Sequence, residues 1–340
     1  MSKVVLFGEI MLRLSPEGFN RFVQADKFDV NFGGSEANVA FSLSNFGIDS
    51  TFISKIPNNE IGDAAFNKLR QYGVDTSKII KDGERLGIYY LEKGASQRPS
   101  KVIYDRSNSS IANSKTNDYN WDEVFKDADW FHFSGITPAL SDSLAEICLD
   151  ACKKAKELNI TVSCDLNYRE KLWSEDKACE IMSEIMPYVD ICIANEEDIE
   201  KVFGIKAKNT DVNKGKLDYN SYKFVADELL NKFDLSKVAC TLRTSISASD
   251  NKWTAMLYDG VKFYQSNEYN IHIVDRVGGG DSFVAGLIYG ILNDWKDYES
   301  LEFATAASCL KHSIEGDFNL VSVKEVKDLA SGNSSGRVQR

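Results

Sequence analysis

The chain has 340 residues, of which 43% are hydrophobic and 27% are charged, as is ordinary for a globular protein. Its 40 basic and 51 acidic residues give a formal net charge of −11, which disfavours nucleic acids and anionic membranes as partners. No apolar stretch in the sequence approaches the roughly 18 residues that a membrane span needs. Any anionic ligand must therefore be held by a pocket that overcomes the charge of the whole chain.

Cysteine usage and the first residues of the sequence indicate a reducing compartment. Seven cysteines are present without a CxxC pair, and most lie within apolar runs such as Ile191–Ile193. This pattern favours buried, reduced thiols. The strand-like run Val4–Phe7 begins too early for a secretory signal. We therefore expect a cytoplasmic protein.

Strand-like and helical segments alternate along most of the chain. Strands are expected at Val4–Phe7, Thr51–Ile56, Trp130–Phe133, Thr161–Asp165, Ile191–Ala194 and Val238–Leu242. Helices are expected at Asp63–Tyr72, Ser143–Leu158, Lys177–Met186 and Tyr222–Phe233. This alternation predicts a three-layer α/β core with a mostly parallel sheet and helices on both faces. Ligands of such sheets bind beyond the carboxyl ends of the strands.

Two stretches interrupt this alternation. Residues 10–31 and 87–106 lack a helical period and alternate aliphatic with polar side chains. We expect them to form a small β-sheet that acts as a lid, or alternatively an edge extension of the main sheet. Residues 1–330 are expected to form one domain. Residues 206–220 are expected to be an exposed polar loop, and residues 331–340 a disordered tail.

The clearest local signal is a run of three glycines, Gly278 to Gly280, followed by Asp281 and a helical pattern. Glycine inside a helix costs roughly 1 kcal/mol, so three together need a reason. Bare N–H groups and the helix dipole at a helix start provide one, because they form an anion site. Asp281 is then either a carboxylate that stabilises the helix start or a base for phosphoryl transfer. The residues alone leave both interpretations open.

A second glycine pair, Gly33 and Gly34, opens another helix that contains Asn38. Neither the P-loop pattern GxxxxGK[ST] nor the dinucleotide pattern GxGxxG occurs in the chain. A dinucleotide-dependent oxidoreductase is therefore disfavoured, and any nucleotide must be bound by another arrangement.

Over nearly its whole length the chain resembles the ribokinase-like, PfkB-type carbohydrate kinases. The signature DTxGAGD of that family corresponds to residues 275–281, and its first glycine element to Gly33-Gly34 with Asn38. The resemblance implies a ribokinase-like core with a small β lid. It also implies that the amides of Gly278, Gly279 and Gly280 form an anion hole for the γ-phosphate of ATP, with Asp281 as the catalytic base.

The chain departs from the family pattern at three positions. Arg276 replaces a threonine and Gly279 an alanine, substitutions that a backbone anion site tolerates. In the family's NxxE motif, which is linked to the placement of Mg²⁺, Asn195 is kept and Asp198 replaces the glutamate. Mg²⁺ usually keeps several waters, so Asn195 and Asp198 are metal candidates acting through water. The alternative is a solvated acidic first turn of a helix.

Within the family, residues 8–16, 134–141 and 165–173 most resemble those of 2-keto-3-deoxygluconate kinases. By position, this resemblance implies substrate contacts at Gly34, Asn38, Tyr89, Tyr104, Arg106, Arg169 and Asp317. It implies ATP contacts at Asn167, Arg243, Ser245, Ser247, Asp250, Gly278 and Gly280. The stretch 242–250, which contains four of these, lacks the glycine that the family commonly has there.

A keto acid needs a fixed cation, and the two parallel donors of an arginine match a carboxylate. Arg106 is the first candidate because it ends the second lid-like segment, and Arg169 is the second; the alternative is that each is a surface ion-pair residue. We therefore expect transfer of the ATP γ-phosphoryl group to a sugar acid, converting 2-dehydro-3-deoxygluconate to its 6-phosphate.

The alternatives are fructokinase or another sugar kinase of the same family, and a catalytically silent sugar sensor. The expected ligands are the sugar acid, ATP and Mg²⁺. A requirement for a monovalent cation and assembly into a homo-oligomer stay open.

Overall fold

The computed structural model describes residues 2–195, 197–206 and 219–333. Of the loop expected at residues 206–220, residues 207–218 lie outside this part, and so do residues 334–340 of the expected tail. The first tail residues are not detached: the backbone N–H groups of Ser331, Gly332 and Asn333 donate to carbonyls near the end of the last helix.

The main sheet has nine strands, and its centre is parallel. The order is β14 (Phe263–Gln265), β13 (Asp250–Tyr258), β12 (Lys237–Ser245), β11 (Ile191–Asn195), β10 (Thr161–Asp165), β9 (Trp130–Ser134), β1 (Lys3–Phe7) and β4 (Asp49–Ile53), with β15 (Tyr269–His272) paired to β13. The strands from β12 to β4 are all parallel, whereas β13 pairs antiparallel with β12, β14 and β15. Five of the six strands expected from the sequence are present, and the one expected at Thr51–Ile56 is divided between β4 and the short strand β5 (Lys55–Ile56). The predicted fold class is confirmed.

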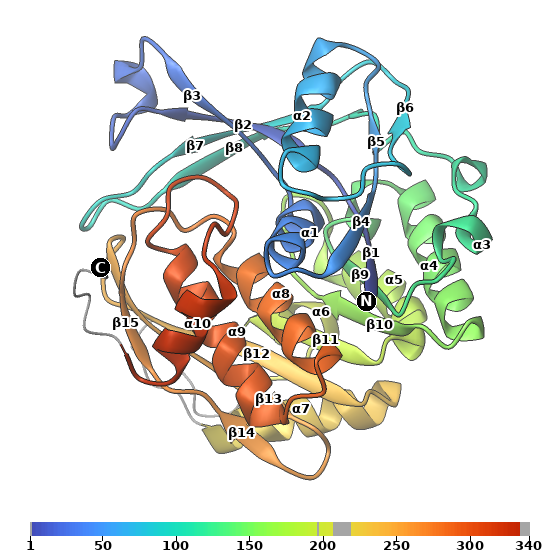
Figure 1. Ribbon diagram of the computed structural model, residues 1–340, viewed down its shortest axis with the longest axis vertical. Coiled ribbons are helices and arrows are strands. Elements are labelled where there is room, and N and C mark those ends of the chain that lie inside the picture. The colour runs from blue at the N-terminus through green and yellow to red at the C-terminus, as the bar shows by residue number, and fades with distance from the viewer. Residues whose placement is uncertain (1, 196, 207–218, 334–340) are drawn as a thin grey trace.

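Helices cover both faces of this sheet, because alternate side chains of the central strands are apolar on both sides. On β1, Val5 and Phe7 face one core while Val4 and Leu6 face the other. The first core packs against α3 (Trp121–Val124), α4 (Asp142–Glu157), α5 (Glu175–Ile185), α6 (Asp198–Phe203) and α7 (Tyr219–Phe233). The second packs against α1 (Ser35–Asn45), α2 (Glu60–Arg70), α8 (Gly279–Leu292), α9 (Asp297–Lys311) and α10 (Val323–Ala330). Three layers result (Figure 1).

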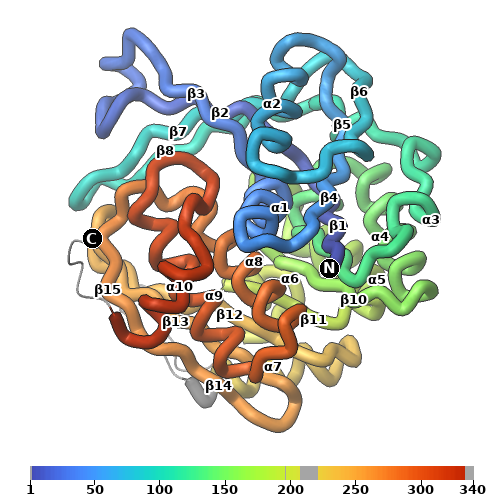
Figure 2. Tube along the Cα trace, in the orientation of Figure 1, coloured from blue at the N-terminus to red at the C-terminus, as the bar shows by residue number. Residues whose placement is uncertain are grey.

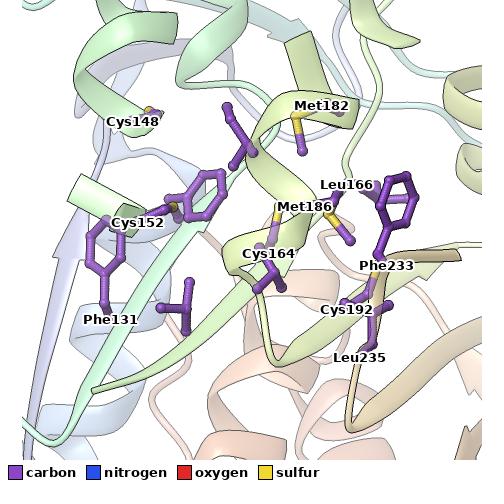
Figure 3. Close-up of a cluster of buried hydrophobic side chains, with 14 of the residues drawn as sticks. Phe131, Cys148, Cys152, Cys164, Leu166, Met182, Met186, Cys192, Phe233 and Leu235 are labelled. Carbon is purple, nitrogen blue, oxygen red and sulfur yellow. The ribbon is translucent and has the colours of Figure 1, made fainter. Parts of the chain in front are cut away.

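Sulfur-containing side chains fill much of the first core. Figure 3 shows Cys148 and Cys152 of α4 and Met182 of α5 near Cys164 of β10, with Phe131 of β9 beside them. All seven cysteines lie within the described residues and none is paired in a disulfide. No described helix combines the length and the apolar character that crossing a bilayer requires.

A separate four-stranded sheet projects from this core at the upper left of Figures 1 and 2. Its order is β3 (Phe28–Gly33), β2 (Met11–Pro16), β7 (Gly87–Glu92) and β8 (Lys101–Asp105), and only the β2–β7 pair is parallel. These strands come from the two stretches that interrupt the alternation in the sequence, and they do not extend the main sheet. A two-stranded pair, β5 (Lys55–Ile56) and β6 (Ile80–Lys81), lies elsewhere.

Candidate active site

A pocket of about 420 Å³ lies at the carboxyl ends of β10, β11 and β12, where the starts of α1 and α8 meet the small sheet. An open α/β sheet binds its ligands at this edge. Most of the candidate residues from the sequence line it: Gly34, Asn38, Tyr89, Tyr104, Arg106, Asn167, Arg169, Asn195, Asp198, Arg243, Gly278, Gly280, Asp281 and Asp317. Gly279, Ser245, Ser247 and Asp250 do not line it.

The three glycines at the start of α8 have different reasons to be glycine. Gly278 caps the helix with a φ of 81°, and a Cβ on it would overlap the carbonyl oxygen of Asp317. A Cβ on Gly279 would overlap the imidazole of His312, which explains why this chain lacks the family's alanine. A Cβ on Gly280 would meet no atom within 4 Å. Packing therefore requires the first two glycines, and the third keeps the N–H groups at the helix start open to the pocket.

Asp281 is held by two side chains of α1. Its Oδ2 accepts a hydrogen bond from Asn38 Nδ2 at 2.7 Å, and its Oδ1 accepts one from Ser35 Oγ at 3.0 Å. Burial raises the pKa of Asp281 to about 6, although both hydrogen bonds and the charge of Arg169 act to lower it. Because burial outweighs these contacts, Asp281 is a stronger base than a solvent-exposed aspartate, a property that proton transfer in phosphoryl transfer can use.

Asp317 belongs to a buried ion network that joins the small sheet to the loops before α8 and after α9. Arg13 of β2 is 1% exposed, and it donates to Asp317 Oδ2 at 2.8 Å and to Asp275 Oδ2 at 2.5 Å. The hydroxyl of Tyr89 donates to Asp317 Oδ1. A Cβ on Gly33 would overlap the same carboxylate, which explains the first glycine of the earlier pair.

The two arginines proposed for a substrate carboxylate have different surroundings. Arg106 is 7% exposed, and its Nε donates to Glu9 Oε2 at 2.9 Å, so its charge is already neutralised by a buried partner. Ser109 Oγ also donates to Glu9, at 2.7 Å. Arg169 is exposed at the pocket and makes no ion pair with the described residues. The structure therefore favours Arg169 over Arg106, contrary to the order expected from the sequence.

Two buried carboxylates lie on the side of the pocket formed by β10 and β11. Asp198 accepts from the backbone N–H groups of Tyr168 and Asn195, each at 3.2 Å, so it is not the solvated residue of the alternative interpretation. Sequence analysis missed Asp165, the last residue of β10, although its place at the carboxyl end of a strand was a usable signal. Burial raises the pKa of Asp165, and so do the charges of Asp198 and Asp281.

Some of the residues expected to contact ATP line the pocket, whereas others lie in the β12–β13 hairpin and do not line it. Asn167 has a φ of 37° and donates to Asp165 Oδ2 at 3.3 Å. Ser247 and Asp250 instead close the β12–β13 turn, where the backbone N–H of Asp250 donates to Ser247 Oγ at 2.9 Å. Since the turn uses these side chains to stabilise itself, they do not reach the pocket.

Arginines also line this side of the pocket. Arg276, noted in the sequence only as a departure, lines it together with Arg243 and Trp253. Burial lowers the pKa of Arg276, and so does the nearby charge of Arg243. Two like charges facing one pocket favour an anionic ligand.

A three-layer α/β fold places a helix start and the carboxylate of Asp281 at one pocket, an arrangement suited to an enzyme that transfers an anionic group to a hydroxyl. The model of the pfkB family carbohydrate kinases matches residues 1–242 and 246–319, and the chain belongs to this family.

Named relatives match the chain over nearly its full length. The crystal structure of 2-dehydro-3-deoxygluconokinase from Thermotoga maritima is 52% identical, with a TM-score of 0.94, and the match covers 98% of this chain and 100% of that one. The 2-dehydro-3-deoxygalactonokinase of Haloferax volcanii is 32% identical over 335 residues, 98% of each chain. The 5-dehydro-2-deoxygluconokinase of Clostridium perfringens is 28% identical over 333 residues, 95% of this chain and 91% of that one.

Gly280→Ala tests whether a ligand binds in the open space beside the Cα of Gly280. The substitution should leave the melting temperature unchanged or raise it, because alanine favours a helix by roughly 0.5–1 kcal/mol and no atom is in the way. Turnover should fall by about tenfold or more, since a methyl group would stand where the anion approaches. Circular dichroism melting and steady-state kinetics measure the two effects.

The matched control is Gly279→Ala, which should lower the melting temperature because its Cβ would overlap His312. A Gly280→Ala enzyme with normal kinetics would show that no ligand group approaches this position.

Proposed function

We propose that this chain transfers the γ-phosphoryl group of ATP to a hydroxyl of a small sugar acid, with 2-dehydro-3-deoxygluconate as the first candidate. The names of the three relatives all denote kinases of dehydro-deoxy sugar acids, which supports the substrate class. The observation that carries the chemistry is Asp281, fixed by α1 beside an open helix start and with a pKa near 6.

In the proposed mechanism, each group near the start of α8 has a distinct role. Asp281 accepts the proton of the attacking hydroxyl, and its raised pKa makes it a stronger base than an ordinary aspartate while leaving it ionised at neutral pH. The backbone amides at this helix start, of which Gly278 and Gly280 line the pocket, would donate hydrogen bonds to the oxygens of the transferred phosphoryl group. Asn38 and Ser35 keep the carboxylate oriented toward the hydroxyl.

Magnesium fits the acidic side of the pocket. Asp165, Asp198 and Asn195 line it, and the charges of neighbouring carboxylates raise the pKa of Asp165, a repulsion that a divalent cation would relieve. Both oxygens of Asp198 already accept backbone hydrogen bonds, which supports contact through water. When bound, the ion would neutralise phosphate charge.

The small sheet supplies the substrate side of the pocket. Tyr89 and Tyr104 are direct cross-strand partners on β7 and β8, with ring centroids 6.1 Å apart, and both line the pocket. Their hydroxyls, together with Asn38 and Asp317, would hold the sugar oxygens. As a lid, this sheet would exclude the water that competes with the sugar hydroxyl for the phosphoryl group.

A cytoplasmic location completes the proposal. Five of the seven cysteines are buried and none is paired in a disulfide, which suits a reducing compartment.

The pH dependence of the reaction tests the role of Asp281. The value of kcat/KM should rise with pH through about 6 and then level off, because only the ionised carboxylate accepts a proton. Asp281→Asn should lower kcat by about 10²–10⁴ and remove this dependence. The melting temperature of the variant at neutral pH should not fall, since burial disfavours the charge that the substitution removes. Near-normal turnover of the variant would exclude Asp281 from the mechanism.

A substrate panel with ATP and Mg²⁺, followed by ADP release, tests the substrate class. The sugar acids should be phosphorylated far more efficiently than fructose, because fructose has no carboxylate for Arg169. Arg169→Ala should raise the KM for the keto acid by about tenfold or more and leave the KM for ATP nearly unchanged. Arg106→Ala, which strands the buried Glu9, should instead destabilise the fold by about 3–5 kcal/mol.

Equal efficiency with fructose would refute the sugar-acid assignment and leave the kinase assignment intact. Sugar binding without ADP release from any substrate would favour the sensor.

A further inference from the structure

Lys311, the last residue of α9, is a buried cation that pairs with no carboxylate of residues 2–195, 197–206 and 219–333. Its side chain has 0% exposure, and its Nζ donates to the carbonyl oxygen of Ile314 at 3.0 Å. No carboxylate among the described residues lies within ion-pair distance of Nζ, and its other two hydrogens find no acceptor there. A buried, incompletely bonded ammonium group is costly, so its position needs a reason.

Lys311 lies directly beneath the glycine loop. The segment that follows α9 packs against the start of α8: His312 O accepts hydrogen bonds from the backbone N–H groups of Val274, at 2.8 Å, and Asp275, at 3.2 Å. The Cε of Lys311 is 3.3 Å from the point where a Cβ on Gly278 would stand. Lys311 does not line the pocket, so the loop itself separates its ammonium from the ligand side.

The charges beneath the loop balance only when Lys311 is counted. Asp275 and Asp317 contribute two buried carboxylates, and Arg13, which bonds both, contributes one positive charge. Burial lowers the pKa of Lys311, whereas the charges of Asp275 and Asp317 raise it. Without Lys311, a net negative charge would lie behind the loop that is proposed to receive a phosphoryl group, and it would repel that group.

We propose that Lys311 is a positioning residue that neutralises the carboxylates behind the glycine loop, so that the phosphoryl group of ATP can bind there without help from a free monovalent cation. This inference rests on the proposed function. It answers the question of cation dependence that the sequence leaves open.

The oxygens beneath the loop are already occupied, which argues against a free monovalent cation at this place. Ile314 O accepts from Lys311, and His312 O accepts two backbone N–H groups. Asp275 accepts from Arg13, from Val277 N at 3.2 Å and from Gly316 N at 3.1 Å. The ligands that such an ion requires are therefore satisfied by groups of the chain itself.

The experiment compares three proteins as full chains: the wild type, Lys311→Met and Lys311→Arg. Kinetics with ATP, Mg²⁺ and 2-dehydro-3-deoxygluconate are measured at constant ionic strength, with choline or with potassium as the monovalent cation. The wild type should be equally active in both salts. Lys311→Met keeps the length of the side chain and removes its charge, so kcat/KM should fall on the order of 10²-fold. Lys311→Arg should recover much of this loss.

The matched control is Lys55→Met. Lys55 is also buried, with 6% exposure, but it pairs with Asp82 and Asp118 away from the pocket. Its loss should lower the melting temperature and leave kcat/KM unchanged.

Lys311→Ala adds a rescue test, because ammonium or methylammonium ions should restore activity by filling the vacated position.

Three results would overturn the proposal: a wild-type rate that potassium raises about tenfold, an effect of Lys311→Met confined to stability as in the control, or a failure of Lys311→Arg to recover activity. If Lys311→Met does not fold, the salt comparison on the wild type still decides.

Calorimetric binding of a non-hydrolysable ATP analogue with Mg²⁺ distinguishes a failure of this proposal from a failure of the proposed function. Lys311→Met should weaken binding of the analogue by about tenfold even if no sugar acid is phosphorylated. Unchanged binding would refute the charge role.

Discussion

Two buried carboxylates, Asp275 and Asp317, lie beneath the loop at the start of α8, and buried charges of this kind are costly unless they are paired. Arg13 of β2, in the small sheet, pairs with both carboxylates and contributes one of the positive charges that balance them. The same side chain therefore connects the small sheet to the glycine loop before α8, and Tyr89 of β7 reinforces the connection through Asp317. Since the pocket walls come from both sheets, the geometry of the site depends on this network.

Local charge explains how a chain with a net charge of −11 can present an anion pocket. Arg169, Arg243 and Arg276 line it. Asp165 and Asp198 line it as well, and the repulsion between them suits a divalent cation. Phosphates and carboxylates of a ligand can thus meet positive groups within a few ångströms, where the charge of the distant surface is screened.

Arg106 and the β12–β13 hairpin show why the position of a residue in the sequence did not suffice to predict its contact with a ligand. Arg106 directly follows β8 of the small sheet at the pocket, yet its guanidinium is paired with Glu9 from the turn after β1, a contact between residues 97 positions apart. The carboxylate of Asp250 likewise accepts a hydrogen bond from Ser247 Oγ in its own turn and lies within hydrogen-bond distance of His272 Nδ1. A sequence motif predicts that a residue lies at the end of a helix or strand. The residue that forms an ion pair with it can come from a distant part of the chain. Packing therefore decides which candidate remains free for a ligand.

The sequence by itself determined the alternating βα core, the two lid-like stretches and the glycine loop before Asp281. These features are local: hydrophobic period, β-branched runs and glycine placement act over a few residues. Only the tertiary structure decided that Gly279 accommodates His312, that Arg106 is paired whereas Arg169 makes no ion pair within the described part of the chain, and that Lys311 lies under the loop. Burial, pKa and ion pairing depend on groups that approach from distant segments, and no local pattern specifies those approaches.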